Sequence, residues 1–204
     1  MVRVIVVLLV VLFLLPSVDE WSQNGQSYCC TTSCPFFLPG LALDLPLLEW
    51  LQKYTFPTES RFQDIQYARS VYERAVDISL GHGTTSANYF ATIHREASET
   101  LADVAEEKGQ RALVGKVCMN RNGFSGYVEQ TADSLNDTRL FVTGLLGRKS
   151  DLVDPVVTPR FVPTCDQELM LGLGEIAKTY DVRVHSHLAE TVPEVNEQIK
   201  NKLA

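Results

Sequence analysis

An alternation of apolar, β-branched runs with helical patterns constrains the fold of this 204-residue chain more than any other feature. The strand-like runs are "TTSANYFATI", "RALVGKVCM", "VDPVVTPRF" and "VRVHSHLA". Helical patterns over residues 96–109, 131–148 and 165–180 separate them. A helix between successive strands predicts right-handed β/α units and a parallel sheet of the α/β class. Such units build an open doubly wound sheet or a (β/α)₈ barrel, and no glycine-rich phosphate loop favours the nucleotide-binding sheet.

Two helices are predicted ahead of this alternation. Residues 44–56 carry leucines on one face, which predicts a short amphipathic helix. Residues 57–83 open with a proline and end at two glycines, which predicts one long helix.

The first 35 residues differ in kind from the rest, and we expect them to lie outside a folded domain that covers residues 36–204. Arg3 precedes twelve unbroken apolar residues, 4–15, and a linker with the cysteine cluster "CCTTSC" comes after them. The apolar run is short for a transmembrane helix and suits the hydrophobic region of a signal peptide. A short membrane anchor and a misassigned first exon are the alternatives.

The charge balance bears on the class of partner. The chain has 18 Lys and Arg residues against 25 Asp and Glu residues, a formal net charge of −7, with no long run of either sign. Nucleic acid is therefore not an expected partner.

Polar side chains gather where the predicted strands end, which is where a barrel carries its function. His185 and His187 lie two residues apart on a strand and so face the same side, and Glu190 lies just beyond. A histidine there can bind a metal that activates water, and the glutamate can carry the proton to a leaving group. The plainer alternative is a pair of solvated or core-satisfied histidines. Arg160 and Phe161 follow another strand, where a cation can clamp a substrate oxygen and a ring can stack on a flat base, although a surface arginine is the commoner case.

His94 opens an H-x-E sequence that matches one half of the zinc-dependent cytidine-type deaminase motif. The P-C-x-x-C half is absent, since Cys165 has no second cysteine three residues later, so that fold is rejected. A hydrogen-bonded structural histidine is the expected role of His94.

Five segments together closely resemble the guanine deaminases, a family of the amidohydrolase superfamily: "DLPLLEWLQKYTFPTESRF", "YFATIH", "GQRALVGKVCM", "VTPRFVPTC" and "VHSHLAE". The resemblance runs from about residue 36 to the C-terminus. It implies a (β/α)₈ barrel with a flanking β-sandwich and one zinc ion. It also implies hydrolysis of a C–N bond in a cyclic amidine, converting guanine to xanthine and ammonia, by a cytoplasmic homodimer.

The resemblance carries over to four residues. His187 matches the zinc ligand at the end of the fifth barrel strand, and Glu190 matches the glutamate that shuttles protons. Arg160 and Phe161 match the pair that recognises the purine. His185 matches no ligand of the family.

The departures from the family limit what this chain is expected to do. The first strand of the family ends in His-x-His, whereas here "FFLPGL" is followed by Ala42, Leu43 and then "DLPLLEWL". Counterparts of the later zinc ligands and of the β-sandwich are also missing. The expectation is a partial barrel of roughly the first five β/α units, with an incomplete zinc site, an unpaired sheet edge and little or no activity. The alternatives are a non-catalytic interaction protein, secreted or membrane-tethered through residues 1–17, and another metal hydrolase of the superfamily.

Overall fold

The computed structural model describes residues 4–7, 28–32, 44–124, 126–188, 191–192 and 195–196. The strands are β1 (Val4–Val7), β2 (Tyr28–Thr32), β3 (Ser86–Phe90), β4 (Arg111–Gly115), β5 (Val117–Cys118), β6 (Val153–Pro159) and β7 (Arg183–His187). The α-helices are α2 (Leu47–Trp50), α3 (Phe56–Ser60), α4 (Ile65–Gly81), α5 (Arg95–Glu107), α6 (Thr131–Arg148) and α7 (Gln167–Thr179). Shorter helical segments are η1 (Leu51–Thr55), η2 (Arg61–Gln63) and η3 (Val162–Thr164).

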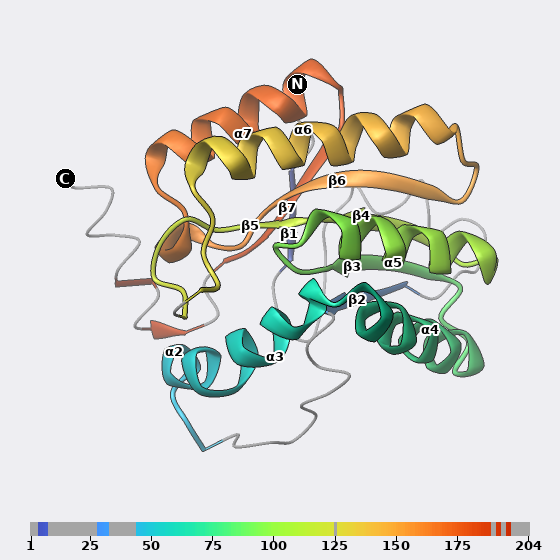
Figure 1. Ribbon diagram of the computed structural model, residues 1–204, viewed down its shortest axis with the longest axis horizontal. Helices are drawn as coiled ribbons and strands as arrows, with labels where there is room; N and C mark the ends of the chain where they lie inside the picture. Colours follow the sequence, from blue (N-terminus) through green and yellow to red (C-terminus); the bar gives the residue numbers. More distant parts are fainter. Residues whose placement is uncertain are drawn as a thin grey trace.

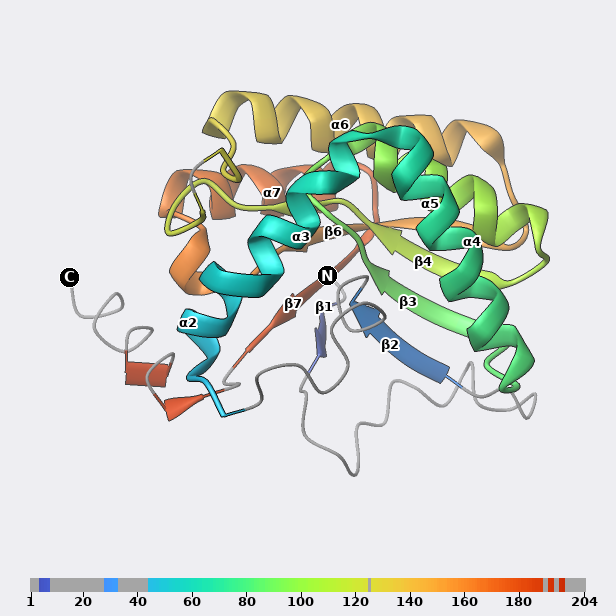
Figure 2. The same cartoon turned by 60° about the horizontal axis from the view of Figure 1, so that its bottom comes forward.

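The strands form one parallel sheet in the order β1-β7-β6-β4-β3-β2, with β5 paired to β6. Figures 1 and 2 show the sheet curving like part of a barrel wall, with α4, α5, α6 and α7 along its outer side. The four strands expected from the alternation are neighbours in chain order, as successive β/α units require. The predicted parallel α/β fold of a partial barrel is therefore confirmed.

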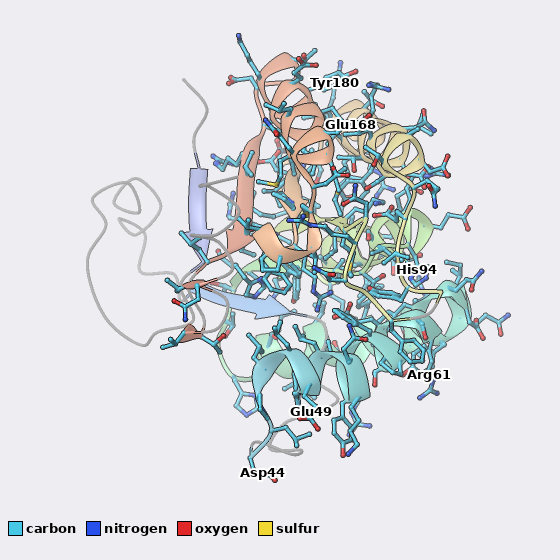
Figure 3. The ribbon with its side chains drawn as sticks, turned by 90° about the vertical axis from the view of Figure 1, so that its left-hand side faces the viewer. Asp44, Glu49, Arg61, His94, Glu168 and Tyr180 are labelled. Carbon is cyan, nitrogen blue, oxygen red and sulfur yellow. The ribbon has the colours of Figure 1, made fainter. Side chains whose placement is uncertain are left out.

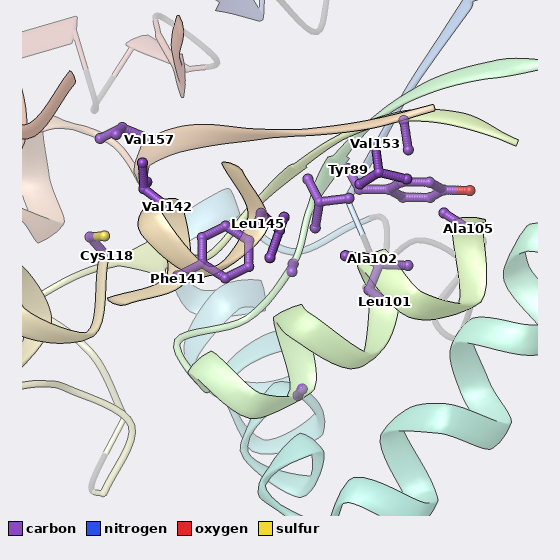
Figure 4. Packing of buried hydrophobic residues seen from close by; sticks show 14 of the residues in the cluster. Tyr89, Leu101, Ala102, Ala105, Cys118, Phe141, Val142, Leu145, Val153 and Val157 are labelled. Carbon is purple, nitrogen blue, oxygen red and sulfur yellow. The ribbon is translucent and has the colours of Figure 1, made fainter. Parts of the chain in front are cut away.

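The main core lies between the sheet and the helices that cover it (Figure 4). Leu101 and Phe141 point inward from α5 and α6 and are fully buried, and Tyr89 and Val157 meet them from the strands. Small residues on α5, among them Ala102, are also fully buried and let this helix lie close to the sheet. Burying such side chains is the main favourable term in holding the layers together, at about 25 cal/mol per Å² of apolar surface.

The prediction of one long helix over residues 57–83 is wrong at its start. Asp64 has an extended backbone (ψ 110°), and its carboxylate accepts hydrogen bonds from the backbone N–H groups of Gln66 (2.9 Å) and Tyr67 (3.2 Å). This is an N-cap, which begins α4 at Ile65 and separates it from α3. An aspartate competes with the helical backbone through its side chain, so an N-cap arose where an uninterrupted helix was expected.

Two short strands, β1 and β2, come from the first 35 residues, which we expected to lie outside the domain. They extend the sheet beyond the strands that the sequence predicted. β1 pairs in parallel with β7, and β2 pairs in parallel with β3. An edge strand offers a row of N–H and C=O groups to any extended segment, so such pairing needs little sequence specificity. β7 and β3 are therefore paired on both sides, and β1 and β2 are the end strands of the described sheet, while the domain boundary near residue 36 stays a prediction. Within the described part of the chain, no helix has both the length and the apolar character needed to cross a membrane.

A close approach inside the curved sheet depends on Gly115. A Cβ atom added there would lie 1.8 Å from Thr158 Oγ1 and 3.1 Å from His185 Nε2. A side chain does not fit, so the glycine lets Thr158 and His185 fill the inner side of the sheet between β4, β6 and β7.

Candidate active site at the carboxyl ends of the strands

An apolar cluster, here called the rim cluster, lies at the carboxyl ends of the strands, apart from the main core. Its buried members are Leu51, Phe56, Phe90, Ile93, Val117, Met119, Tyr127 and Phe161. They come from η1, α3, two strands and the loops after the strands, so the α2–α3 segment packs across the strand ends. Figure 3 views the molecule from this side, with α2 and α3 in the lower half of the picture. The polar residues of the site lie among these rings.

Arg160 directly follows β6, and backbone hydrogen bonds link it to β5 on one side and to β7 on the other. Its N–H donates to Cys118 O (3.1 Å), and its carbonyl accepts from the N–H of His187 (3.1 Å). Parallel strands that end at one edge bring residues from distant parts of the chain together, so Arg160 and His187 are neighbours across 27 residues. The structure thus brings the predicted site residues Arg160 and His187 together at one edge of the sheet.

Glu59 holds the guanidinium of Arg160 in a two-point ion pair. Arg160 Nη1 donates to Glu59 Oε2 (2.7 Å) and Nη2 donates to Oε1 (3.1 Å). Both side chains are buried, with exposed fractions of 7% and 3%. The hydroxyl of Tyr127 donates to the same Oε2 (2.6 Å) and accepts from the N–H of Ile93 (3.3 Å). Burial and then the Glu59 carboxylate raise the pKa of Tyr127 well above its usual value, so the phenol keeps its proton for this bond.

Aromatic rings surround the guanidinium. The Arg160 Cζ atom lies 4.8 Å from the centre of the Phe56 ring and 5.9 Å from that of Phe90. Phe90 also meets the ring of His187 edge-on, at 4.4 Å between centroids. A cation held over aromatic faces and paired with a carboxylate is fixed in both position and plane.

His187 is a buried, neutral imidazole. Burial, followed by the charge of Arg160, lowers the pKa of His187 to about 4. A neutral imidazole is the form that binds a metal, so the predicted ligand is in the right protonation state. Glu190, the predicted proton carrier, lies outside the described residues, and its role stays a prediction.

His185 belongs to a hydrogen-bonded network on the inner side of the sheet. Its Nδ1 lies 2.7 Å from Asn88 Oδ1, and its Nε2 lies 2.9 Å from Thr158 Oγ1. A neutral ring that donates from Nδ1 to the amide oxygen accepts the threonine hydroxyl at Nε2. The ring also stacks on Phe90, at 5.4 Å between centroids. Both ring nitrogens have protein partners, so His185 is a structural residue rather than a metal ligand.

His94, labelled in Figure 3, precedes α5 and lies near the rim cluster. Its Nδ1 lies 3.2 Å from Thr92 Oγ1, and its ring centre lies 5.8 Å from that of Tyr127. Burial and then the charge of Lys116 lower the pKa of His94 to about 4. These contacts agree with the structural role expected for this residue.

The described residues alone do not fit a catalytic zinc ion. A zinc site of this kind uses three protein ligands. Among the residues that the structure describes, no group of three or more His, Cys, Asp or Glu side chains is placed to hold a metal. His187 is thus not part of a set of three described side chains that could hold the ion.

A second buried ion pair lies close to the site. Lys116 Nζ donates to Glu129 Oε1 (2.5 Å), with exposed fractions of 0% and 10%. Glu129 also accepts from the Met119 N–H (3.3 Å) and from Ser134 Oγ (2.9 Å). Lys116 separates β4 from β5 in what the sequence predicted as one strand, "RALVGKVCM".

Neither Glu59 nor Tyr127 is among the residues that the sequence singles out for the site. Glu59 has one visible signal, its place in the first turn of a predicted helix, and that signal concerns capping rather than chemistry. Glu59 and Arg160 are 101 positions apart in the sequence, which keeps any local pattern from linking them.

A cleft of about 260 Å³ opens beside the site. Phe56 and Phe161 line it, together with Leu48, Leu51, Gln52, Asn122, Pro163 and Thr164. Arg160 and His187 do not line it, but Phe56 both lines the cleft and contacts the Arg160 guanidinium.

Comparison with known proteins agrees with these features. Residues 37–203 match the amidohydrolase family. Guanine deaminase from Dictyostelium discoideum is 49% identical over 156 residues, which cover 76% of this chain and 35% of that protein. Human guanine deaminase is 48% identical over 182 residues, which cover 81% of this chain and 40% of that protein.

Solved structures give the same relationship. The structure of guanine deaminase from C. acetobutylicum with bound guanine superposes with a TM-score of 0.81 and 36% identity, over 87% of this chain and 42% of that one. The chain spans roughly two fifths of the length of the curated relatives named above, 35% and 40%. The chain belongs to the amidohydrolase family, and the predicted resemblance to guanine deaminases within it is confirmed.

Proposed function

We propose that this chain provides the purine-recognition half of a guanine deaminase, a hydrolase that converts guanine to xanthine and ammonia. The observation that supports it most is the buried Arg160, fixed by Glu59 beside Phe161 at the carboxyl ends of parallel strands. The likeness to a guanine deaminase with guanine bound supports the same substrate.

The chemistry of the pair suits a flat heterocycle. A guanidinium donates N–H groups in one plane, which matches the carbonyl oxygen and the ring nitrogen acceptors of guanine. Phe161, the next residue, lines the neighbouring cleft, and stacking of rings is favourable beyond the area it buries. Guanine is uncharged at neutral pH, so recognition rests on hydrogen bonds and stacking rather than on ionic attraction.

The hydrolytic step in this family is typically metal-dependent, and we propose zinc as the metal, with His187 as a ligand and Glu190 as the proton carrier. When bound, zinc supplies an activated water for attack on the amino-bearing carbon. The missing His-x-His before "DLPLLEWL" and the donor set of the described residues support a chain that binds guanine without turnover. A cytoplasmic homodimer belongs to this proposal by family likeness alone.

A non-catalytic binding protein is the second candidate, and the same donor set favours it. The two candidates differ in their ligand. The purine-recognition half of a guanine deaminase binds guanine, whereas an interaction protein built on the same fold has no need to.

The test is guanine binding by calorimetry, zinc content of the purified chain, and absorbance of guanine during incubation with added zinc. We expect guanine binding, less than stoichiometric zinc and no turnover. Arg160→Met and Phe161→Leu should each weaken guanine binding by about tenfold or more, since each removes a direct contact. Arg139→Met, at an exposed arginine on α6, is the matched control and should bind like the unaltered chain. Stoichiometric zinc with turnover would overturn the inactive assignment, and absence of guanine binding would overturn the recognition role.

A further inference from the structure

The contact between Glu59 and Arg160 goes beyond what recognition of a purine requires. Two hydrogen bonds in fork geometry join the two side chains, and both are removed from water. Such a pair has close to zero net charge, whereas an arginine alone would present a full positive charge to whatever binds beside it. The carboxylate therefore changes which ligands the arginine favours as well as where it lies.

Glu59 is itself held in place. Tyr127 donates to the same oxygen that accepts from Arg160 Nη1, and the backbone N–H of Ile93 fixes the Tyr127 hydroxyl. Phe56, on the same short helix as Glu59, lies against both the guanidinium and the Tyr127 ring, which is 5.7 Å away between centroids. The helix α3 thus carries both Glu59, which balances the charge of Arg160, and Phe56, whose ring helps to fix the plane of the guanidinium.

We propose that Glu59 is a positioning and specificity-determining residue: it orients Arg160 and cancels its charge, so that the site selects an uncharged purine over a purine anion. This inference rests on the proposed function, because it takes Arg160 as a contact of the bound base. Burying an ion pair costs desolvation energy that a pair of apolar residues would avoid, and a gain in specificity is one reason to retain it. A merely structural pair would stabilise the chain without affecting the choice between neutral and anionic purines.

The experiment compares guanine, which is neutral, with urate, which is an anion at neutral pH, as ligands of the full chain. The quantity measured is the ratio of the Kd for urate to the Kd for guanine, by calorimetry. The unaltered chain should favour guanine. Glu59→Gln should lower the ratio by roughly tenfold to a hundredfold, the usual range for a hydrogen-bonded charge, because Arg160 then presents its charge to the ligand. Glu59→Asp retains the carboxylate and should recover most of the ratio even if both ligands bind less tightly.

Glu129→Gln is the matched control, since it removes a buried carboxylate from the other ion pair without touching Arg160. It should leave the ratio unchanged. If Glu59→Gln does not fold, Tyr127→Phe replaces it, because it removes one bond to Glu59 and keeps the ring; the ratio should then fall roughly threefold.

The outcomes separate the two proposals. An unaltered chain that binds neither ligand would overturn the proposed function and this inference together. Guanine binding with a ratio that is the same in the unaltered chain and in Glu59→Gln, or in Tyr127→Phe where that variant replaces it, would overturn the inference and leave guanine recognition standing. A fall in the ratio that Glu129→Gln reproduces would also overturn it, since the cause would then be general loosening of the fold.

Discussion

Two buried ion pairs lie near the ends of the strands, and they differ in the sequence distance they bridge and in what surrounds them. Lys116 and Glu129 are 13 residues apart, and their other bonds go to backbone groups and a serine nearby. Arg160 and Glu59 are 101 residues apart, and rings that belong to the rim cluster surround them. The first pair supports the local path of the chain between two strands, while the second holds a side chain where a ligand can meet it.

Each cation also acts on a histidine. Lys116 lowers the pKa of His94, and Arg160 lowers the pKa of His187, in both cases after burial as the larger cause. A compact ammonium and a planar guanidinium thus have the same electrostatic effect but different capacity for recognition, because only the guanidinium offers a plane of donors. Substitutions at and around the two pairs can test this division between a structural pair and a functional one.

The largest expected effect on stability is that of Lys116→Met. It leaves the Glu129 carboxylate buried without its cation, which costs about 3–5 kcal/mol of unfolding free energy. Urea denaturation measures this change, and guanine binding by the folded fraction should be unaltered. Lys116→Met combined with Glu129→Leu should recover most of the loss. A loss of guanine binding in the folded single variant would contradict the structural role of this pair.

Gly115→Ala tests the close approach next to Lys116. The new Cβ would overlap Thr158 Oγ1, and overpacking of this kind typically costs about 1–3 kcal/mol. Thermal unfolding of the variant measures the cost. Gly81→Ala, at a glycine in α4 whose added Cβ meets nothing within 4 Å, is the control and should be neutral or slightly stabilising. Equal effects at the two glycines would show that the inner side of the sheet has room for a methyl group.

The pH dependence of stability should carry a contribution from His94. Its pKa is about 6.5 when unfolded and about 4 when folded, so the folded state binds fewer protons. The contribution is full above pH 6.5 and is lost as the pH falls toward 4. His94→Gln should flatten the slope of unfolding free energy over this range by on the order of 1 kcal/mol, allowing for partial exposure. An unchanged slope would mean that His94 is accessible to water in both states.

The smallest effect is expected at an exposed ion pair. Lys108 Nζ lies 2.7 Å from Asp77 Oδ1, but the two side chains are 26% and 61% exposed. Lys108→Met should change the unfolding free energy by less than about 1 kcal/mol, because water screens such a pair. Urea denaturation of Lys108→Met and Lys116→Met under the same conditions gives the comparison. Similar losses of unfolding free energy in the two variants would show that burial does not decide how much an ion pair contributes.

Much of the sheet can be predicted from local patterns in the sequence. Apolar strands such as Val153–Pro159 alternate with helices such as Gln167–Thr179, and the β/α rule then gives their parallel order without further information. The same rule places Arg160 and His187 at one edge. The split helix at Asp64 and the break at Lys116 were missed, because single side chains that bond to the backbone or to a distant partner override the periodicity around them.

Residue types and spacing along the chain thus determine the strand order, the edge that carries polar side chains and the likeness to guanine deaminases. Only the tertiary structure decides which groups meet at that edge. Glu59 accepts hydrogen bonds from both Arg160 and Tyr127. The two ring nitrogens of His185 form hydrogen bonds with Asn88 and Thr158. The physical reason is that sequence periodicity fixes which way a side chain faces, whereas the partner it meets depends on how distant segments pack.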